Sequence, residues 1–96
     1  MEILVTYDVS TESAEGRSRL RRVAKVCEAY GQRVQKSVFE CIVNSMELEL
    51  LVHELTSIID LKEDSLRIYR LREPYRQYVQ VLGKKPRFDL REPLVT

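Results

Sequence analysis

The chain has 96 residues, which is the size of a single domain with a small hydrophobic core. Hydrophobic residues make up 44% and charged residues 32% of the sequence, a balance typical of globular proteins that excludes a disordered chain. The formal net charge is only +1, so binding to nucleic acid would require a local cluster of basic residues. No apolar stretch reaches the roughly 18 residues of a membrane span, and the first residues lack the pattern of a signal peptide, so we expect a cytoplasmic protein with no membrane partner.

Residues 2–9 (EILVTYDV) predict an N-terminal β-strand, because Ile, Val, Thr and Tyr favour strands. Asp is depleted inside strands and favours their ends, so we expect Asp8 at the boundary between this strand and the following loop. Side chains alternate along a strand, so Tyr7 should point to the opposite face and pack there. Asp8 is the first candidate for chemistry, although an Asp in this position is also common as a turn or cap residue.

Four arginines lie within a stretch of six residues after this strand: Arg17, Arg19, Arg21 and Arg22. Such a cluster suits the phosphates of a polyanion, which makes nucleic acid the leading hypothesis for the ligand. Arg17, Arg21 and Lys25 recur every four residues and should repel one another on one helix face, which a bound polyanion would relieve. The same row is also compatible with an ordinary solvated helix face.

Hydrophobic periodicity predicts the remaining elements. A helix is expected from about residue 17 to Tyr30, with Gly31 at its C-cap. A second helix should follow Asn44, which forms a capping box with Glu47. Runs of residues that favour strands predict three further strands, at residues 33–43, 65–71 and 77–82, the last two separated by a turn.

The expected order βαβαββ is close to the split βαβ plan, an α+β ferredoxin-like fold in which two helices cover one face of an antiparallel sheet. We expect a ferredoxin-like domain over residues 1–83 and an extended C-terminal tail over residues 84–96, which packs on the sheet edge or on a dimer partner. The other sheet face is left open. In a small domain, an uncovered apolar face predicts a homodimer with two-fold symmetry.

The two cysteines and the single histidine show no metal-binding pattern. Cys27 and Cys41 lie inside predicted elements without a CxxC or Cys/His spacing, so we interpret both as buried thiols. His53 has no second histidine near it and is expected in a surface or packing role. A zinc site is therefore not expected.

Three segments together suggest a family. The strand that ends in Tyr7-Asp8, the helix segment LRRV at residues 20–23 and the segment RVQKSVFE at residues 33–40 resemble the small CRISPR-associated adaptation protein, the ferredoxin-like partner of the spacer integrase. The resemblance covers nearly the whole chain. It implies a homodimer, metal-dependent endonuclease activity, and a scaffolding role with a CRISPR integrase subunit in the capture of foreign DNA.

The resemblance also implies roles for individual residues. The catalytic aspartate of the family corresponds to Asp8 and its aromatic neighbour to Tyr7. The family's arginines on the first helix and at the start of the second strand correspond to Arg22 and Arg33, and either Arg19 or Arg21 takes the second helix position. The serine and phenylalanine of the second strand, which would shape the cleft, correspond to two residues here: Ser37 and Phe39.

Phosphodiester hydrolysis needs a hard cation, and Mg²⁺ bound by carboxylate oxygens is the expected cofactor. One protomer supplies one suitable carboxylate, so two-fold pairing would bring Asp8 and its symmetry mate to a single cleft. An alternative is a non-catalytic dimeric adaptor that bridges integrase subunits and binds double-stranded DNA; a further one is a dimeric domain that binds another ligand. The sequence leaves both DNA and single-stranded RNA open as cleavage substrates.

Overall fold

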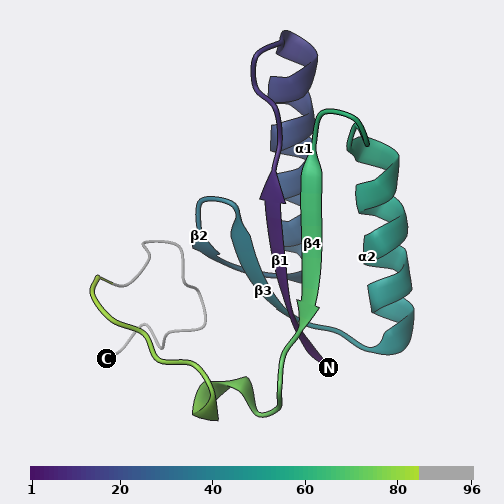
Figure 1. Ribbon diagram of the computed structural model, residues 1–96. Helices are drawn as coiled ribbons and strands as arrows, with labels where there is room; N and C mark the ends of the chain where they lie inside the picture. The colour runs from purple at the N-terminus through teal and green to yellow at the C-terminus, as the bar shows by residue number, and fades with distance from the viewer. Residues whose placement is uncertain (85–96) are drawn as a thin grey trace.

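The computed structural model describes residues 1–84, which form a four-stranded antiparallel sheet packed against two helices (Figure 1). The expected α+β ferredoxin-like class is confirmed. The sheet order is β2-β3-β1-β4, so β1 and β3 are central. In chain order the elements are β1 (Glu2–Asp8), α1 (Ala14–Tyr30), β2 (Gly31–Gln35), β3 (Val38–Ile42), α2 (Ser45–Ile58), β4 (Ser65–Arg70) and a short 3-10 helix η1 (Tyr75–Gln77). The tail predicted over residues 84–96 lies, apart from its first residue, outside the described residues.

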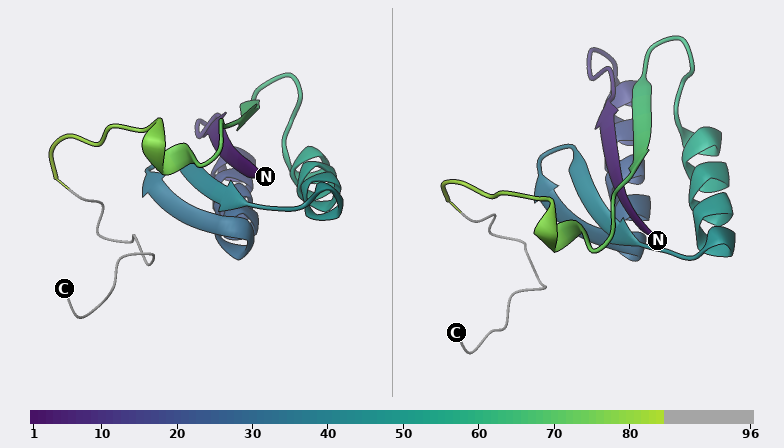
Figure 2. Two further views of the ribbon diagram at one scale, coloured as in Figure 1. Left: turned by 90° about the horizontal axis from the view of Figure 1, so that it is seen from below. Right: turned by 60° about the horizontal axis from the view of Figure 1, so that its bottom comes forward.

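Strand β1 organises the core because its side chains alternate between the two faces of the sheet. Ile3, Val5 and Tyr7 are buried on one face of the sheet. Both helices cover this face, as Figure 2 shows from two further directions. Phe39 on β3 is fully buried opposite Val5. By strand alternation the intervening residues of β1, including Asp8, lie on the opposite face. Neither α1 nor α2 covers that face (Figure 2). We call this uncovered side the open face.

The two helices begin at side-chain caps that the sequence encodes. Helix α1 starts earlier than expected, because the Ser13 hydroxyl accepts a hydrogen bond from the Gly16 backbone N–H at 3.0 Å. Helix α2 begins at the predicted capping box, in which Asn44 and Glu47 exchange side-chain hydrogen bonds. Gly31 follows α1 as predicted, but its backbone is extended. A Cβ there would collide with the Glu40 carbonyl oxygen, so close approach of β3 explains this glycine.

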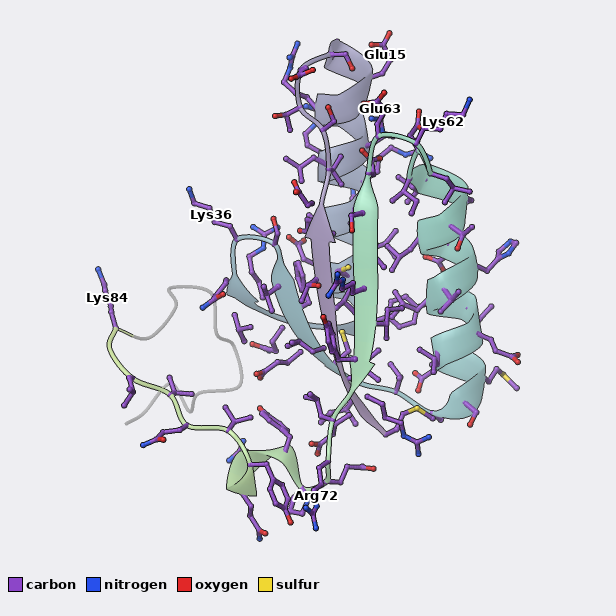
Figure 3. The ribbon with its side chains drawn as sticks, viewed as in Figure 1. Glu15, Lys36, Lys62, Glu63, Arg72 and Lys84 are labelled. Carbon is purple, nitrogen blue, oxygen red and sulfur yellow. The ribbon has the colours of Figure 1, made fainter. Side chains whose placement is uncertain are left out.

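The single strand predicted at residues 33–43 is wrong, since this segment forms a hairpin of β2 and β3. Gln35 pairs with Val38, which leaves Lys36 and Ser37 as a two-residue turn. Figure 3 shows Lys36 pointing outward at the tip of this hairpin. The element order is therefore βαββαβ. The last strand, β4, pairs with β1 at the edge of the sheet.

The strand predicted at residues 77–82 is also wrong. After β4 the chain forms η1, in which the Tyr78 N–H donates to the Tyr75 carbonyl, and residues 78–84 make no strand. Alternation alone is not sufficient, because a strand needs a neighbour with which to form a ladder. Four hydrophobic residues in this segment are exposed: Tyr78, Val79, Val81 and Leu82.

The remaining expectations about burial are confirmed. Cys27 and Cys41 are buried, and burial raises the pKa of Cys27 to about 12. His53 is exposed on α2. Among residues 1–84, neither helix has the length and apolar character required to cross a membrane.

Candidate active site

A shallow hollow of about 280 Å³ lies on the open face, where β1 and β4 run side by side. Asp8 is at its end, exposed, and pairs in register with Ser65 at the start of β4. The position follows from the sequence, because β1 delivers its last side chain to the uncovered side. The residues that line the hollow are Thr6, Tyr7, Asp8, Ser65, Arg67 and Tyr69.

The hollow combines one carboxylate, two aliphatic hydroxyls and one guanidinium group. Asp8 is its only acidic lining residue and Arg67 its only basic one. Arg67 donates a hydrogen bond from Nη1 to the Tyr69 hydroxyl at 2.9 Å, and this bond raises the pKa of Arg67. An arginine held in this way keeps its positive charge at any pH suited to hydrolysis.

The oxygen groups of the hollow fit a weakly held Mg²⁺ ion. Mg²⁺ is usually bound through one or two carboxylates and keeps several waters, and phosphate oxygens of the substrate complete the set. Asp8 supplies the carboxylate, and two residues with hydroxyl groups, Thr6 and Ser65, line the same hollow. Among the residues that the structure describes, no three Asp, Glu, His or Cys side chains cluster as a complete metal site. One protomer therefore offers a single charged ligand.

Tyr7, Phe39 and Arg33 form a cluster on the helix-covered face. The Tyr7 and Phe39 rings stack with centroids 6.2 Å apart, and the Arg33 guanidinium lies 5.1 Å from the Phe39 ring centre. Burial raises the pKa of Tyr7, and the neighbouring Arg33 opposes part of that rise. Arg33 also forms an ion pair with Glu28 at 3.7 Å. Tyr7 packs as predicted, and this cluster supports β1 from behind.

Ser37 contacts β1 through its backbone, since its carbonyl oxygen accepts a hydrogen bond from the Tyr7 N–H at 3.1 Å. This bond ties the tip of the β2–β3 hairpin to β1 one residue before Asp8. Ser37 therefore helps to fix the end of β1.

Arg19 is engaged in a buried ion pair with Asp64. Its Nε atom lies 2.7 Å from the Asp64 carboxylate, which has no solvent exposure. The same carboxylate accepts hydrogen bonds from the backbone N–H groups of Ser10 and Asp60. These bonds join α1, the loop after Asp8 and the start of β4. Arg19 thus has a structural role near the site, because its guanidinium is bound to Asp64 within the fold.

The other α1 arginines are exposed but do not reach the hollow. Arg17, Arg21 and Arg22 are exposed residues of α1, and α1 lies behind the sheet, on the side away from the open face (Figure 1). Arg17 donates to the Thr11 carbonyl at 3.2 Å. The structure therefore separates the two features that the sequence suggested would act together, and none of the predicted arginines lines the hollow.

Five residues of the site were missed in the sequence analysis: Thr6, Asp64, Ser65, Arg67 and Tyr69. Arg67 and Tyr69 were recognised only as part of an alternating strand. The signal for them was available, because residues two apart in a strand share a face, but only the pairing of β4 with β1 shows that this face carries Asp8.

The fold and the hollow define an α+β ferredoxin-like protein with an exposed aspartate at the end of its first strand. Residues 1–79 match the family described as CRISPR associated protein Cas2. The chain belongs to this family.

Individual relatives agree with this assignment. The chain is 59% identical over 95 residues to the CRISPR-associated endoribonuclease Cas2 1 of Moorella thermoacetica, and 58% identical to the CRISPR-associated endonuclease Cas2 of Halalkalibacterium halodurans, with 99% of each chain covered in both cases. The crystal structure of Streptococcus pyogenes Cas2 superposes with a TM-score of 0.79 at 55% identity and covers 86% of this chain and 100% of that one.

Proposed function

We propose that the protein is a homodimeric, Mg²⁺-dependent endonuclease that binds nucleic acid and acts with a CRISPR integrase subunit in spacer acquisition. The observation that carries the nuclease proposal is the exposed Asp8 carboxylate in a hollow that also holds two hydroxyls and a guanidinium. Relatives named endoribonuclease and endonuclease at 59% and 58% identity support the same activity. The test is cleavage of DNA and RNA by the purified protein with Mg²⁺ and with a chelator.

The proposed chemistry divides between the bound ion and the side chains. When bound, Mg²⁺ would activate a water and neutralise charge on the phosphate. Asp8 would hold the ion with one carboxylate, while the Thr6 and Ser65 hydroxyls can bond to its waters. Because the site is shallow and has a single carboxylate per protomer, the expected cleavage rate is modest.

A second copy of the chain is the proposed cover for the open face. Ile42 is 66% exposed at the end of β3 and pairs with Glu2 on that face. Further apolar area comes from residues 78–82, beyond η1. Burying this surface against a symmetric copy would also bring two Asp8 carboxylates closer together.

We expect Ile42→Asp to weaken self-association at least about tenfold, because a charge would be buried in an apolar interface. Sedimentation velocity at micromolar concentrations measures this. Leu50→Asp is the matched control, since Leu50 is 51% exposed on α2, away from the open face. A wild-type protein that sediments as a monomer would contradict the dimer, and equal weakening by both variants would contradict this interface.

A non-catalytic adaptor that bridges integrase subunits is a second candidate, favoured by the position of the basic residues. Arg17, Arg21, Arg22 and Lys25 are exposed on α1, on the helix side of the domain. Duplex DNA bound there would not need Asp8.

Replacing Arg21 and Arg22 with Ala should weaken binding of double-stranded DNA similarly for every sequence. The slope of log affinity against log salt should flatten by about 0.9 for each phosphate that the variant no longer neutralises. Arg33→Ala belongs in a separate variant, because this residue also packs on Phe39. The double variant Arg70→Ala with Arg76→Ala removes equal charge elsewhere. Unchanged affinity and salt slope in the α1 variant would show that the α1 arginines are only solvent-exposed and do not bind DNA.

A further inference from the structure

The hollow around Asp8 contains one cation, the guanidinium of Arg67, which the metal site does not require. A nucleic acid cleaved at Asp8 must place a backbone phosphate in the hollow, and a cationic side chain there would stabilise and orient that anion beyond what the metal ion does. Helix α1 lies behind the sheet and none of its arginines lines the hollow. Arg33 lies against Phe39 on the covered face. Arg67 is the only basic residue among those that line the hollow.

The strand register places Arg67 within reach of a phosphate beside Asp8. Arg67 is directly opposite Thr6, and Asp8 is opposite Ser65. Arg67 is therefore the diagonal neighbour of Asp8 across the ladder, and such neighbours are roughly 7–8 Å apart, with their Cβ atoms somewhat closer. This separation leaves room for a phosphate between a carboxylate and a long, flexible arginine side chain.

The guanidinium of Arg67 is oriented by Tyr69. Tyr69 shares the open face two residues further along β4, and its hydroxyl accepts from Nη1 of Arg67 at 2.9 Å. Within residues 1–84, neither Asp8 nor any other carboxylate forms an ion pair with Arg67. Arginine presents five N–H donors, so most of them stay available for an anion.

An ordinary structural role explains this arrangement less well. A charge that only stabilised the fold could pair with the neighbouring carboxylate, which β1 presents on the same face. Instead, the two opposite charges stay apart in one hollow, and a neutral hydroxyl holds the guanidinium.

We propose that Arg67, oriented by Tyr69, binds the backbone phosphate of the nucleic acid that is positioned for hydrolysis beside Asp8. This role rests on the proposed nuclease function. Arg67 contacts the substrate, whereas Tyr69 is a positioning residue that acts through Arg67. The guanidinium can bind two phosphate oxygens at once, which fixes the orientation of the group as well as its place.

Binding without cleavage tests the interaction with phosphate by itself. All variants carry Asp8→Asn, and the probes are a short DNA duplex and a single-stranded RNA of equal length, titrated over a range of salt. For the probe bound more tightly, Arg67→Ala should lower affinity about tenfold and flatten the salt slope by about 0.9 for the duplex or 0.7 for the single strand. Arg67→Lys should keep the slope and lose part of the affinity. Tyr69→Phe should also keep the slope.

Arg70→Ala is the matched control, because Arg70 is exposed on the same strand and opposite Ile3, away from the hollow. Its affinity and slope should equal those of the parent. An Arg67→Ala variant with the parent's slope and affinity would overturn the proposal. So would an equal loss in Arg70→Ala, since that would show a general effect of net charge.

Cleavage with Asp8 intact separates this proposal from the nuclease function. Arg67→Ala should lower kcat/KM about tenfold or more, Tyr69→Phe should lower it by a smaller factor, and Arg67→Lys should recover part of the loss. If the wild-type protein cleaves neither probe but Arg67→Ala still has a flatter salt slope, the nuclease proposal fails and phosphate binding by Arg67 stands. If the wild type cleaves and Arg67→Ala cleaves equally well, the role of Arg67 fails alone.

Discussion

Replacing Asp8 with Asn should abolish Mg²⁺-dependent cleavage, with a loss of at least about 100-fold, because the hollow has no other carboxylate to hold the ion. The same change should alter the free energy of unfolding by no more than about 0.5 kcal/mol, since the Asp8 side chain is exposed and contributes nothing to the core. Cleavage assays and thermal melts of the same preparations measure the two effects. Excess chelator should reproduce the loss in the wild type.

Glu12→Gln is the matched control for this experiment, because Glu12 is an exposed carboxylate in the loop after β1, outside the hollow. It undergoes the same change from acid to amide and should cleave at the wild-type rate. Wild-type cleavage by Asp8→Asn, in a preparation free of contaminating nuclease, would remove Asp8 as the metal ligand. The adaptor function would then be the better account.

The second large effect concerns stability, and we expect it at Asp64. Asp64→Asn should lower the free energy of unfolding by about 2 kcal/mol at pH 7, because the solvent-inaccessible carboxylate accepts charge-assisted bonds from Arg19 and backbone bonds from two loops. For a domain of this size, that corresponds to a melting temperature lower by roughly 10 °C. Glu63→Gln, at the exposed preceding residue, should change little.

The pH dependence of this difference follows from the pKa of Asp64. The hydrogen bond from Arg19 holds that pKa below its usual range, so the unfolded chain binds the proton more readily than the folded one. The stabilisation is complete above the unfolded value of about 3.9 and is lost as the pH falls through the folded value. Denaturant titrations should show a constant difference between wild type and Asp64→Asn from pH 7 to about 5, and a smaller one below about 4. A difference independent of pH would contradict the charged pair.

Much of the fold could be predicted because local signals and packing agree. The β-branched run before Asp8 gave the central strand, and Asn44 with Glu47 gave the start of α2. The hairpin was missed because its turn residues, Lys36 and Ser37, are not the Asn-Gly or Asp-Gly pair typical of a two-residue turn. Neither residue has a positive φ. Without a turn signal, residues 33–43 read as one continuous strand.

The site was predictable where it depends on a single element and unpredictable where it depends on pairing between elements. Strand alternation separates Tyr7 from Asp8, and the structure agrees. The arginine cluster appeared close to Asp8 because it is close in sequence, yet α1 carries those arginines to the helix side. Arg67 is 59 positions from Asp8, and only the β1–β4 ladder makes them neighbours. The Arg19–Asp64 pair depends on the same long-range register.

Because both thiols are buried, oxidation or alkylation of the cysteines is expected mainly in the unfolded chain. Only the thiolate reacts readily with oxidants or alkylating agents, and burial raises the pKa of Cys27 to about 12, so the folded protein holds almost none of the reactive form at neutral pH. Cys41 is equally enclosed, in β3 behind Gly31. Opening of the domain would return the Cys27 thiol to its ordinary acidity and expose both thiols. Oxidation of the cysteines is therefore controlled by the folding equilibrium of the domain.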